Sequence, residues 1–237
     1  MAILSMTKRV VAVGVVLVVC GGMFWSLAAN DKDFQTDFSV DKKNLGVSGS
    51  NPYINLAPGY QMSYRHDKET KVVTVLDEIK RIDDVDSRVV EDREFDSDGK
   101  IVELTRGYYA IDVLTNDVYC MGKDVDEYDK YGMVKGHGGS WLSGVNGAKF
   151  GLMMPAIPRA GARFYQVQAA GVAMDRVEID SLTETLAVPA GWYIKVVVHA
   201  VETTPLERGK EHKWYVAGVG AVKDDDMELV KYGMKYQ

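Results

Sequence analysis

The segment SRVVEDREFDSDGKIVELTRGYYAIDVL, residues 87–114, decides the fold class of this chain. Two runs in it are rich in Val, Ile, Tyr and Thr, the side chains that suit a pleated, half-buried strand. Between them lies Asp96–Gly99, and glycine accepts the positive φ angle that a tight hairpin turn requires. The segment therefore predicts two antiparallel β-strands joined by a turn at Asp96–Gly99.

Similar runs continue outward from this hairpin, separated by turn residues. Val188–Gly191 is one such turn, in which Pro189 fixes φ and Gly191 frees it. After residue 50, no stretch keeps the i, i+3, i+4, i+7 apolar spacing of an amphipathic helix. We therefore predict an all-β fold, an antiparallel meander that forms a curled sheet, half-barrel or lipocalin-like shell. Its strands are expected over 71–80, 87–95, 100–114, 118–122, 162–168, 175–188, 191–203, 212–218 and 227–233.

A long glycine-rich segment, residues 132–161, interrupts these runs and carries Trp141 and Phe150. Loops of this length are uncommon in compact domains unless they are functional or packed. We expect this segment to cover one end of the curled sheet.

The N-terminus holds an uncharged apolar run, residues 10–29, directly after Lys8 and Arg9. Roughly 20 apolar residues cross the hydrocarbon of a bilayer as a helix, which favours a retained anchor that contacts lipid. A cleaved signal peptide also begins with basic residues and ends with small ones, so cleavage near Ala29 is the alternative. We therefore predict one N-terminal apolar helix over 1–29, either signal peptide or membrane anchor. The anchor side chains would be Val10, Val16, Phe24 and Trp25, with the two aromatic residues at the interface.

The rest of the chain is expected to form two parts. Residues 30–50 are polar and contain glycine and serine, which predicts a linker. Residues 51–237 are expected to form a single exported β domain. The predicted location is the periplasmic or extracytoplasmic side of a membrane, with a secreted or periplasmic domain as the alternative after cleavage.

The chain has two cysteines, and Cys20 lies in the apolar run, so the exported domain cannot form an internal disulfide. Lipid attachment at Cys20 is a further alternative, although Leu17–Val19 lacks the small residue that lipoprotein signals place before the cysteine. Cys120 is expected to be a small, buried apolar side chain.

The charge balance argues against nucleic-acid binding. The chain has 28 Lys and Arg residues against 34 Asp and Glu residues. Two of the cations lie in residues 1–29, which leaves 26 cations against 34 anions and a net charge of −8. No basic stripe is present, and nucleic-acid binding needs clustered cations that neutralise phosphates. An acidic domain is also poorly suited to anionic lipid headgroups.

Gly218, Gly220 and Lys223 lie close together in EHKWYVAGVGAVKDDD, residues 211–226. The spacings GxxxxGK[ST] and GxGxxG are both absent, and Asp224–Asp226 follows where a phosphate-binding helix would have to begin. We therefore expect no nucleotide and interpret the glycines as a bend between strands.

No catalytic constellation stands out in the sequence. His137–Trp141 reads HGGSW, similar to the oxyanion turn of esterases, but the G-x-S-x-G elbow is missing. The histidines at 66, 137, 199 and 212 share no metal-ligand spacing. Acidic turns at 83–86, 124–129 and 224–226 could be weak calcium sites or solvated turns. We therefore assign no catalytic residue, no cofactor and no metal, and expect that the protein is not an enzyme.

Aromatic residues on the expected strands are the remaining candidates for a site. Tyr109, Trp141, Trp192 and Trp214 could line a ligand cavity or an interface, where large rings with one polar atom are common. They could equally belong to a packed core.

Four segments carry a resemblance to a known family: NPYINLAPGY (51–60), GSWLSGVNGAKFGLMMPAIPRAG (139–161), VPAGWY (188–193) and EHKWYVAGVGAVK (211–223). They resemble motifs of an exported family of bacterial β-rich proteins, often lipoproteins, of uncharacterised function. The resemblance implies a half-barrel or lipocalin-like exported domain, and it supplies no catalytic residue.

These observations favour a non-enzymatic, membrane-anchored β-domain that serves as an accessory or scaffold subunit of a membrane protein complex. The main alternative is a carrier module for an apolar ligand or lipid, which a curled, aromatic-rich sheet could form. An exported hydrolase is a third alternative, and it would need titratable groups that converge in a cleft.

Overall fold

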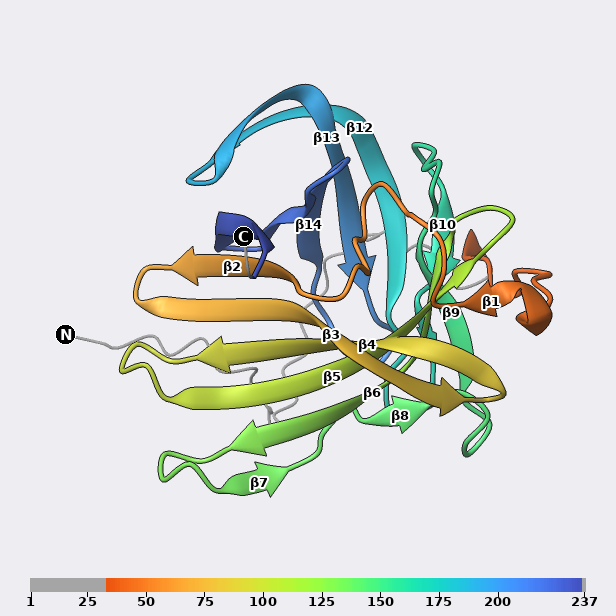
Figure 1. The fold of residues 1–237 in the computed structure, drawn as a ribbon, viewed down its shortest axis with the longest axis horizontal. Coiled ribbons are helices and arrows are strands. Elements are labelled where there is room, and N and C mark those ends of the chain that lie inside the picture. The colour runs from red at the N-terminus through yellow and green to blue at the C-terminus, as the bar shows by residue number, and fades with distance from the viewer. Residues whose placement is uncertain (1–32, 236–237) are drawn as a thin grey trace, which may run out of the picture. The chain divides into compact units, whose positions relative to one another are not determined.

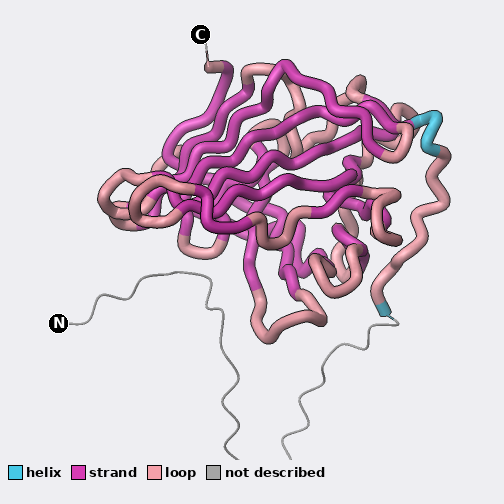
Figure 2. Tube along the Cα trace, turned by 90° about the horizontal axis from the view of Figure 1, so that it is seen from below, coloured by secondary structure: helices cyan, strands magenta, loops and turns pink. Residues whose placement is uncertain are grey.

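The computed structural model describes residues 33–235, which belong to the compact unit Asp31–Gln237. Strands make up nearly all of its regular structure, and η2 (Lys42–Asn44) is a single short 3-10 turn (Figure 2). In the described residues no helix has the length and apolar character needed to cross a membrane. The predicted apolar helix with Val10, Val16, Phe24 and Trp25 lies outside these residues and stays a prediction.

One antiparallel sheet of sixteen strands forms the fold (Figure 1). The prediction of an all-β, antiparallel, curled architecture is therefore confirmed. The strands are β1 (Leu45–Gly46), β2 (Tyr60–His66), β3 (Glu69–Ile82), β4 (Val85–Phe95), β5 (Ile101–Asp112), β6 (Val118–Tyr128), β7 (Val134–Gly136), β8 (Trp141–Leu142), β9 (Lys149–Met154), β10 (Arg163–Tyr165), β11 (Val167–Gln168), β12 (Arg176–Val188), β13 (Gly191–Thr203), β14 (Glu211–Val216), β15 (Gly220–Asp224) and β16 (Met227–Met234).

The sheet consists of two meanders, and the last strand of one pairs with the first strand of the other. Strands β2 to β6 follow one another in the sheet, and so do β12 to β16. The last strand, β16, then pairs with β2, with Met234 opposite Tyr60. A simple meander describes each half, but this pairing between distant segments of the chain is what unites them.

The sheet nearly closes because its two edge strands are consecutive in the chain. The strand order begins with β10 and ends with β11, and only Gln166 separates these strands in sequence. β10 pairs with β12, whereas β11 pairs with β9. The same stretch of backbone therefore ends both sides of the sheet and leaves little free edge, which limits unwanted pairing with other chains.

The predicted turns form as expected. At the hairpin between β4 and β5, the backbone N–H of Gly99 donates to the carbonyl of Asp96, and Gly99 has φ 77°. The Asp96 carboxylate accepts hydrogen bonds from the N–H groups of Asp98 and Lys100. Val188 lies opposite Gly191 at the start of the β12–β13 hairpin, and Gly218–Gly220 connects β14 to β15. The interpretation of these last glycines as a bend between strands is confirmed.

The Gly218–Gly220 turn packs on the NPY segment that opens the predicted domain. The N–H of Gly218 donates to the Pro52 carbonyl, and the hydroxyl of Tyr60 donates to the Val219 carbonyl at 2.8 Å. Asn51 secures this corner, since its amide donates to the carbonyls of residues 116 and 154 while its side-chain oxygen accepts from the N–H groups of residues 53 and 54. Two of the motifs that carry the family resemblance, residues 51–60 and 211–223, are thus hydrogen-bonded to each other.

Residues 33–50 lie against the sheet, although the sequence predicted a polar linker here. Phe34 and Leu45 are buried, and β1 pairs with β5. The backbone of Gln35 forms an isolated bridge to Phe164 of β10. A few apolar residues spaced along this polar segment hold it on the domain. The composition of the segment is polar on average, so composition alone predicts a linker.

The glycine-rich segment 132–161 forms part of the sheet instead of a separate cover. Its strands β7, β8 and β9 each pair with β6. Gly122 of β6 and Gly151 of β9 both pass close to neighbouring backbone, where a side chain would collide. The glycines therefore mark close packing of backbones, which composition alone does not distinguish from a loop.

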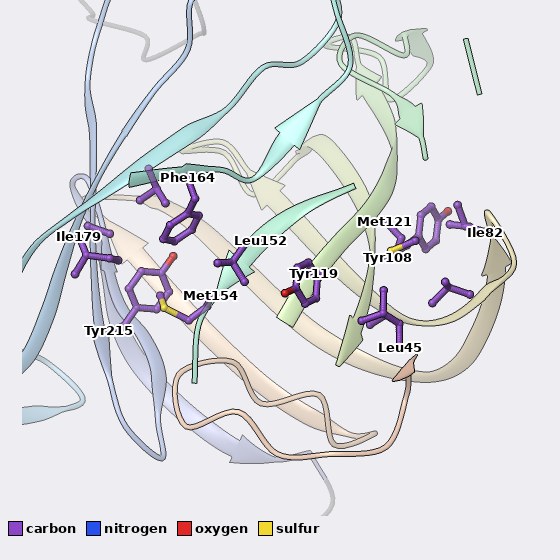
Figure 3. Packing of buried hydrophobic residues seen from close by; sticks show 14 of the residues in the cluster. Leu45, Ile82, Tyr108, Tyr119, Met121, Leu152, Met154, Phe164, Ile179 and Tyr215 are labelled. Carbon is purple, nitrogen blue, oxygen red and sulfur yellow. The ribbon is translucent and has the colours of Figure 1, made fainter. Parts of the chain in front are cut away.

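The largest core cluster runs through the interior without interruption (Figure 3). Phe164, Ile179 and Tyr215 pack with Met154 and Leu152 at one end. Tyr119 lies in the middle, with edge-to-face contacts to the rings of Phe38 and Phe150. Leu45, Ile82, Tyr108 and Met121 continue the cluster at the other end (Figure 3).

Gly151 offers a test of sheet closure. A Cβ atom at this position would lie 2.4 Å from the carbonyl oxygen of Tyr165 and 2.5 Å from the carbonyl of Gln166. Because backbone cannot rotate away as a flexible side chain can, Gly151→Ala should lower the free energy of unfolding by about 2 kcal/mol or more. Urea unfolding followed by circular dichroism measures the change.

Gly46→Ala is the matched control, since Gly46 also lies in a strand and a Cβ there has no atom within 4 Å. It should change stability by less than about 0.5 kcal/mol. Equal stabilities of the two variants would contradict the role assigned to Gly151.

Candidate functional site

The four candidate aromatic residues occupy different environments, and the structure does not bring them together as a set. Tyr109 and Trp141 pack around the buried Cys120 in the same apolar cluster. Trp192 is 80% exposed on β13, and Trp214 lies on β14 beside two histidines. Only Trp192 and Trp214 therefore occupy positions from which they could contribute to a surface or polar site.

The interior contains a cluster of charged side chains centred on Lys71. Its ammonium lies 3.1 Å from Asp92, 3.5 Å from Glu94 and 3.0 Å from Asp224. Lys213 continues the cluster, 2.8 Å from Glu202 and 3.9 Å from Asp224. Because β15 and β3 are not neighbours in the sheet, the Lys71–Asp224 contact ties the two meanders together.

Burial sets the protonation behaviour of this cluster. Desolvation alone would lower the pKa of Lys71, but the carboxylates of Asp92, Asp224 and Glu94 raise it well above its usual value. For Asp92, burial raises the pKa to about 6 against the opposing effect of Lys71. Burial therefore outweighs the contact with Lys71, and the Asp92 carboxyl titrates near pH 6.

A second polar cluster lies on β12, β13 and β14, with His199 at its centre. The Nδ1 atom of His199 is 3.0 Å from Oδ2 of Asp180 and 3.2 Å from Oε1 of Glu184. Its Nε2 atom is 2.9 Å from Nδ1 of His212. His199 itself is only 8% exposed, whereas the side chain of Asp180 is 56% exposed, so the cluster reaches from the protein interior to solvent.

Irregular pairing of β12 with β13 creates this convergence. Ile179 pairs with Ala200 and Glu184 pairs with Val197, so five steps along β12 lie opposite three steps along β13. In a regular strand, Asp180 and Glu184 would be about 13 Å apart along the chain direction. The bulges shorten this stretch and turn both carboxylates toward one imidazole, as bulges often do beside functional sites.

Trp214 and His212 hold the cluster in place. The indole N–H of Trp214 donates to Oε2 of Glu184 at 2.9 Å, and its ring stacks on His199 with centroids 4.9 Å apart. The backbone N–H of His212 donates to the Asp225 carboxylate, and the N–H of Asp225 donates back to the His212 carbonyl. One of the acidic turns considered as a calcium site thus fastens the strand that carries His212.

Two hollows in the described residues are open to the surface. The larger, about 520 Å³, is lined by Arg106, Asp124, Asp126, His137 and Ser140, together with Leu104 and Val125. Ser140 Oγ accepts a hydrogen bond from the Val125 N–H, and His137 Nδ1 lies 2.9 Å from Asp126. Neither hollow is an apolar cavity enclosed by the sheet, so the carrier alternative receives no support from the structure.

The β12–β13 hairpin exposes apolar side chains near its tip. Trp192, Ile194 and Val196 are 80%, 62% and 52% exposed. The hairpin arches out from the other strands (Figure 1), but its tip is held, because the N–H of Ala190 donates to the Leu229 carbonyl of β16. Val188 is buried beside Leu229, so the exposed patch is fixed on the domain.

The histidine cluster can be anticipated only in part from the sequence. His199 and His212 lie in adjacent predicted strands, which makes a shared sheet surface possible. The two carboxylates could not be identified, because bulges break the period-two alternation on which such reasoning depends. Cys120 is buried as expected, and burial raises the pKa of its thiol to about 11.

The raised pKa of Asp92 predicts a pH effect on stability. Unfolded, the carboxyl titrates near pH 3.8, whereas in the folded protein it keeps its proton up to about pH 6. The stabilisation that comes from this protonated carboxyl is therefore fully present below about pH 4 and is lost as the pH rises to about 6. Over that range the free energy of unfolding falls by about 1.4 kcal/mol per pH unit. Asp92→Asn removes this titration, so wild type should lose stability relative to the variant between pH 4 and pH 7. Urea unfolding of both proteins at several pH values between 4 and 7 measures their free energies of unfolding. A difference between the two that does not change with pH would contradict the raised pKa.

Comparison with known proteins gives two structural neighbours. No family model and no curated protein matches the chain. One neighbour is a provisionally assigned lipoprotein from Parabacteroides distasonis, with 10% identity and a TM-score of 0.35. The other is a provisionally assigned exported protein with a YmcC-like fold from Bacteroides fragilis, with 18% identity and a TM-score of 0.32. Each alignment covers 78% of this chain and 100% of the neighbour. The exported or lipoprotein character is stated of those proteins, and a similarity at this level does not transfer it to this chain.

Proposed function

We propose that the protein is an exported, membrane-anchored β-domain that works as a non-enzymatic assembly module, docking another subunit of a membrane complex through the β12–β13 hairpin. The exposed patch of Trp192, Ile194 and Val196 is the observation that carries the proposal. Tryptophan is a frequent anchor at protein interfaces because it buries a large area on contact.

The position of the patch suits recognition. The opposite side of the hairpin packs on the domain through Val188, Leu186 and Tyr193. A partner would therefore meet apolar side chains that are already fixed, and it would not have to order them on binding. Exposed apolar groups that are gathered on one rigid element commonly mark interaction sites.

The charge of the domain favours a protein partner over a lipid surface. Residues 30–237 carry 26 cations against 34 anions. Headgroups of anionic lipids would repel this excess, and basic clusters are what normally hold a domain on such membranes. We therefore assign the patch to a subunit of a complex, while contact with lipid is assigned to the predicted helix over residues 1–29.

Replacing the patch should release the protein from its complex. We expect the double variant Trp192→Ser, Ile194→Ser to migrate at lower mass than wild type in native electrophoresis of solubilised membranes, with its melting temperature nearly unchanged. Tyr131→Ser is the matched control, because Tyr131 is 78% exposed on a different turn, and it should keep the mass of wild type.

Three outcomes would overturn the proposal, the first two in native electrophoresis and the third in a vesicle-binding assay. In the first, the patch variant migrates with wild type. In the second, purified wild-type protein alone reaches the mass seen in membranes, which would make the partner a second copy of the chain. Binding of the wild-type domain to neutral vesicles, lost in the double variant, would instead assign the patch to lipid.

A further inference from the structure

The carboxylates of Asp180 and Glu184 converge on the His199 imidazole, and the proposed docking function does not involve this cluster. One ligand atom from each residue lies within 4.8 Å of the other two. We propose that these three residues form a binding site for a divalent first-row transition metal ion, for which Zn²⁺ is the probe.

The distances fit such an ion with little rearrangement. Zn²⁺ binds nitrogen and oxygen ligands at about 2.0–2.2 Å, so two ligand atoms at a tetrahedral angle are about 3.3–3.5 Å apart. The His199 Nδ1 atom is now 3.0 Å from Asp180 and 3.2 Å from Glu184. These contacts would have to open by only a few tenths of an ångström, and Asp180 is exposed enough to adjust.

The charge of the cluster also calls for a cation. Within residues 33–235, the ion-pair partner of Asp180 and of Glu184 is His199, and neither carboxylate pairs with a lysine or an arginine. Two carboxylates therefore share one imidazole. A divalent ion would balance both negative charges, and it would bind Nδ1 in its deprotonated form.

The surrounding residues have the arrangement that supports metal ligands. When Nδ1 of His199 binds a metal, Nε2 carries the proton, and Nδ1 of His212 lies 2.9 Å away as its acceptor. The Trp214 indole binds Oε2 of Glu184 and leaves Oε1 for the ion. Such contacts set the tautomer and direction of the ligands. His212 and Trp214 are thus positioning residues of the site.

The choice of ion follows from the ligand atoms. Imidazole suits Zn²⁺ and its neighbours, whereas Ca²⁺ needs six to eight oxygen atoms, more than this cluster offers. Three protein ligands leave a fourth position for water or for a donor from another molecule. That position would lie on the side of Asp180, which faces solvent.

Direct metal binding tests the site. Full-length protein without a histidine tag is stripped with chelator, and Zn²⁺ binding is measured by titration calorimetry and by metal analysis after dialysis. We expect one ion per chain in wild type, bound with a micromolar or lower dissociation constant. Asp180→Asn and Glu184→Gln should each weaken binding at least tenfold. Trp214→Phe removes the hydrogen bond to Glu184 and should weaken Zn²⁺ binding about tenfold. The melting temperature of the metal-free protein should change little in this variant.

Asp126→Asn is the matched control, because Asp126 forms a similar 2.9 Å contact with His137 but has no second carboxylate beside that histidine in the described ion pairs. This variant should bind Zn²⁺ as wild type does. The visible spectrum of the Co²⁺-loaded wild-type protein gives a second readout that needs no variant to fold, and it should show the intense bands of a four-coordinate site.

Three results would overturn the proposal: no Zn²⁺ bound by wild type, equal affinities in wild type and Asp180→Asn, or displacement of Zn²⁺ by equimolar Ca²⁺. None of them bears on docking by the hairpin tip, since Trp192 and Ile194 belong to neither the ligands nor their positioning residues. Likewise, a failure of docking would leave the metal site intact.

Discussion

Close contact between the backbone of Gly151 and that of Tyr165 and Gln166 is the constraint on which the rest of this structure depends. It allows β9 to pass close to residues 163–168, so that β10 pairs with β12 while β11 pairs with β9. Among the long strands of the two meanders, the direct pairing is that of β16 with β2. Because β10 pairs with β12, the long β12–β13 hairpin begins from a paired edge instead of a free one.

The nearly closed sheet encloses both apolar and charged side chains. Buried charges are costly unless they are paired, and the Lys71 cluster pairs them across strands that are not neighbours in the sheet. Its value to the fold lies in specificity, since Lys71 reaches Asp224 only when β3 and β15 take their observed positions. The same burial raises the pKa of Asp92 above that of a carboxylate at the surface.

The β12–β13 hairpin carries both features for which a function is proposed. At its tip, one side packs on β16 while Trp192, Ile194 and Val196 face solvent. Nearer its base, bulges bring Asp180 and Glu184 to His199, and the neighbouring strand supplies His212 and Trp214. A metal ion at the base would brace the hairpin from which the patch projects, although each feature stands on its own contacts.

The sequence by itself determined the class of the fold, most of its strands and its turns, because period-two alternation and residues such as Gly99 and Pro189 act locally. It also determined the acidic charge that argues against nucleic acid. Only the tertiary structure decided that residues 33–50 pack on the sheet, that segment 132–161 supplies strands, and that β16 pairs with β2. It alone decided which carboxylates meet His199, because bulges interrupt the period-two alternation of β12 and change the direction of its side chains. Such contacts join residues far apart in the chain, and local sequence preferences do not encode their distances.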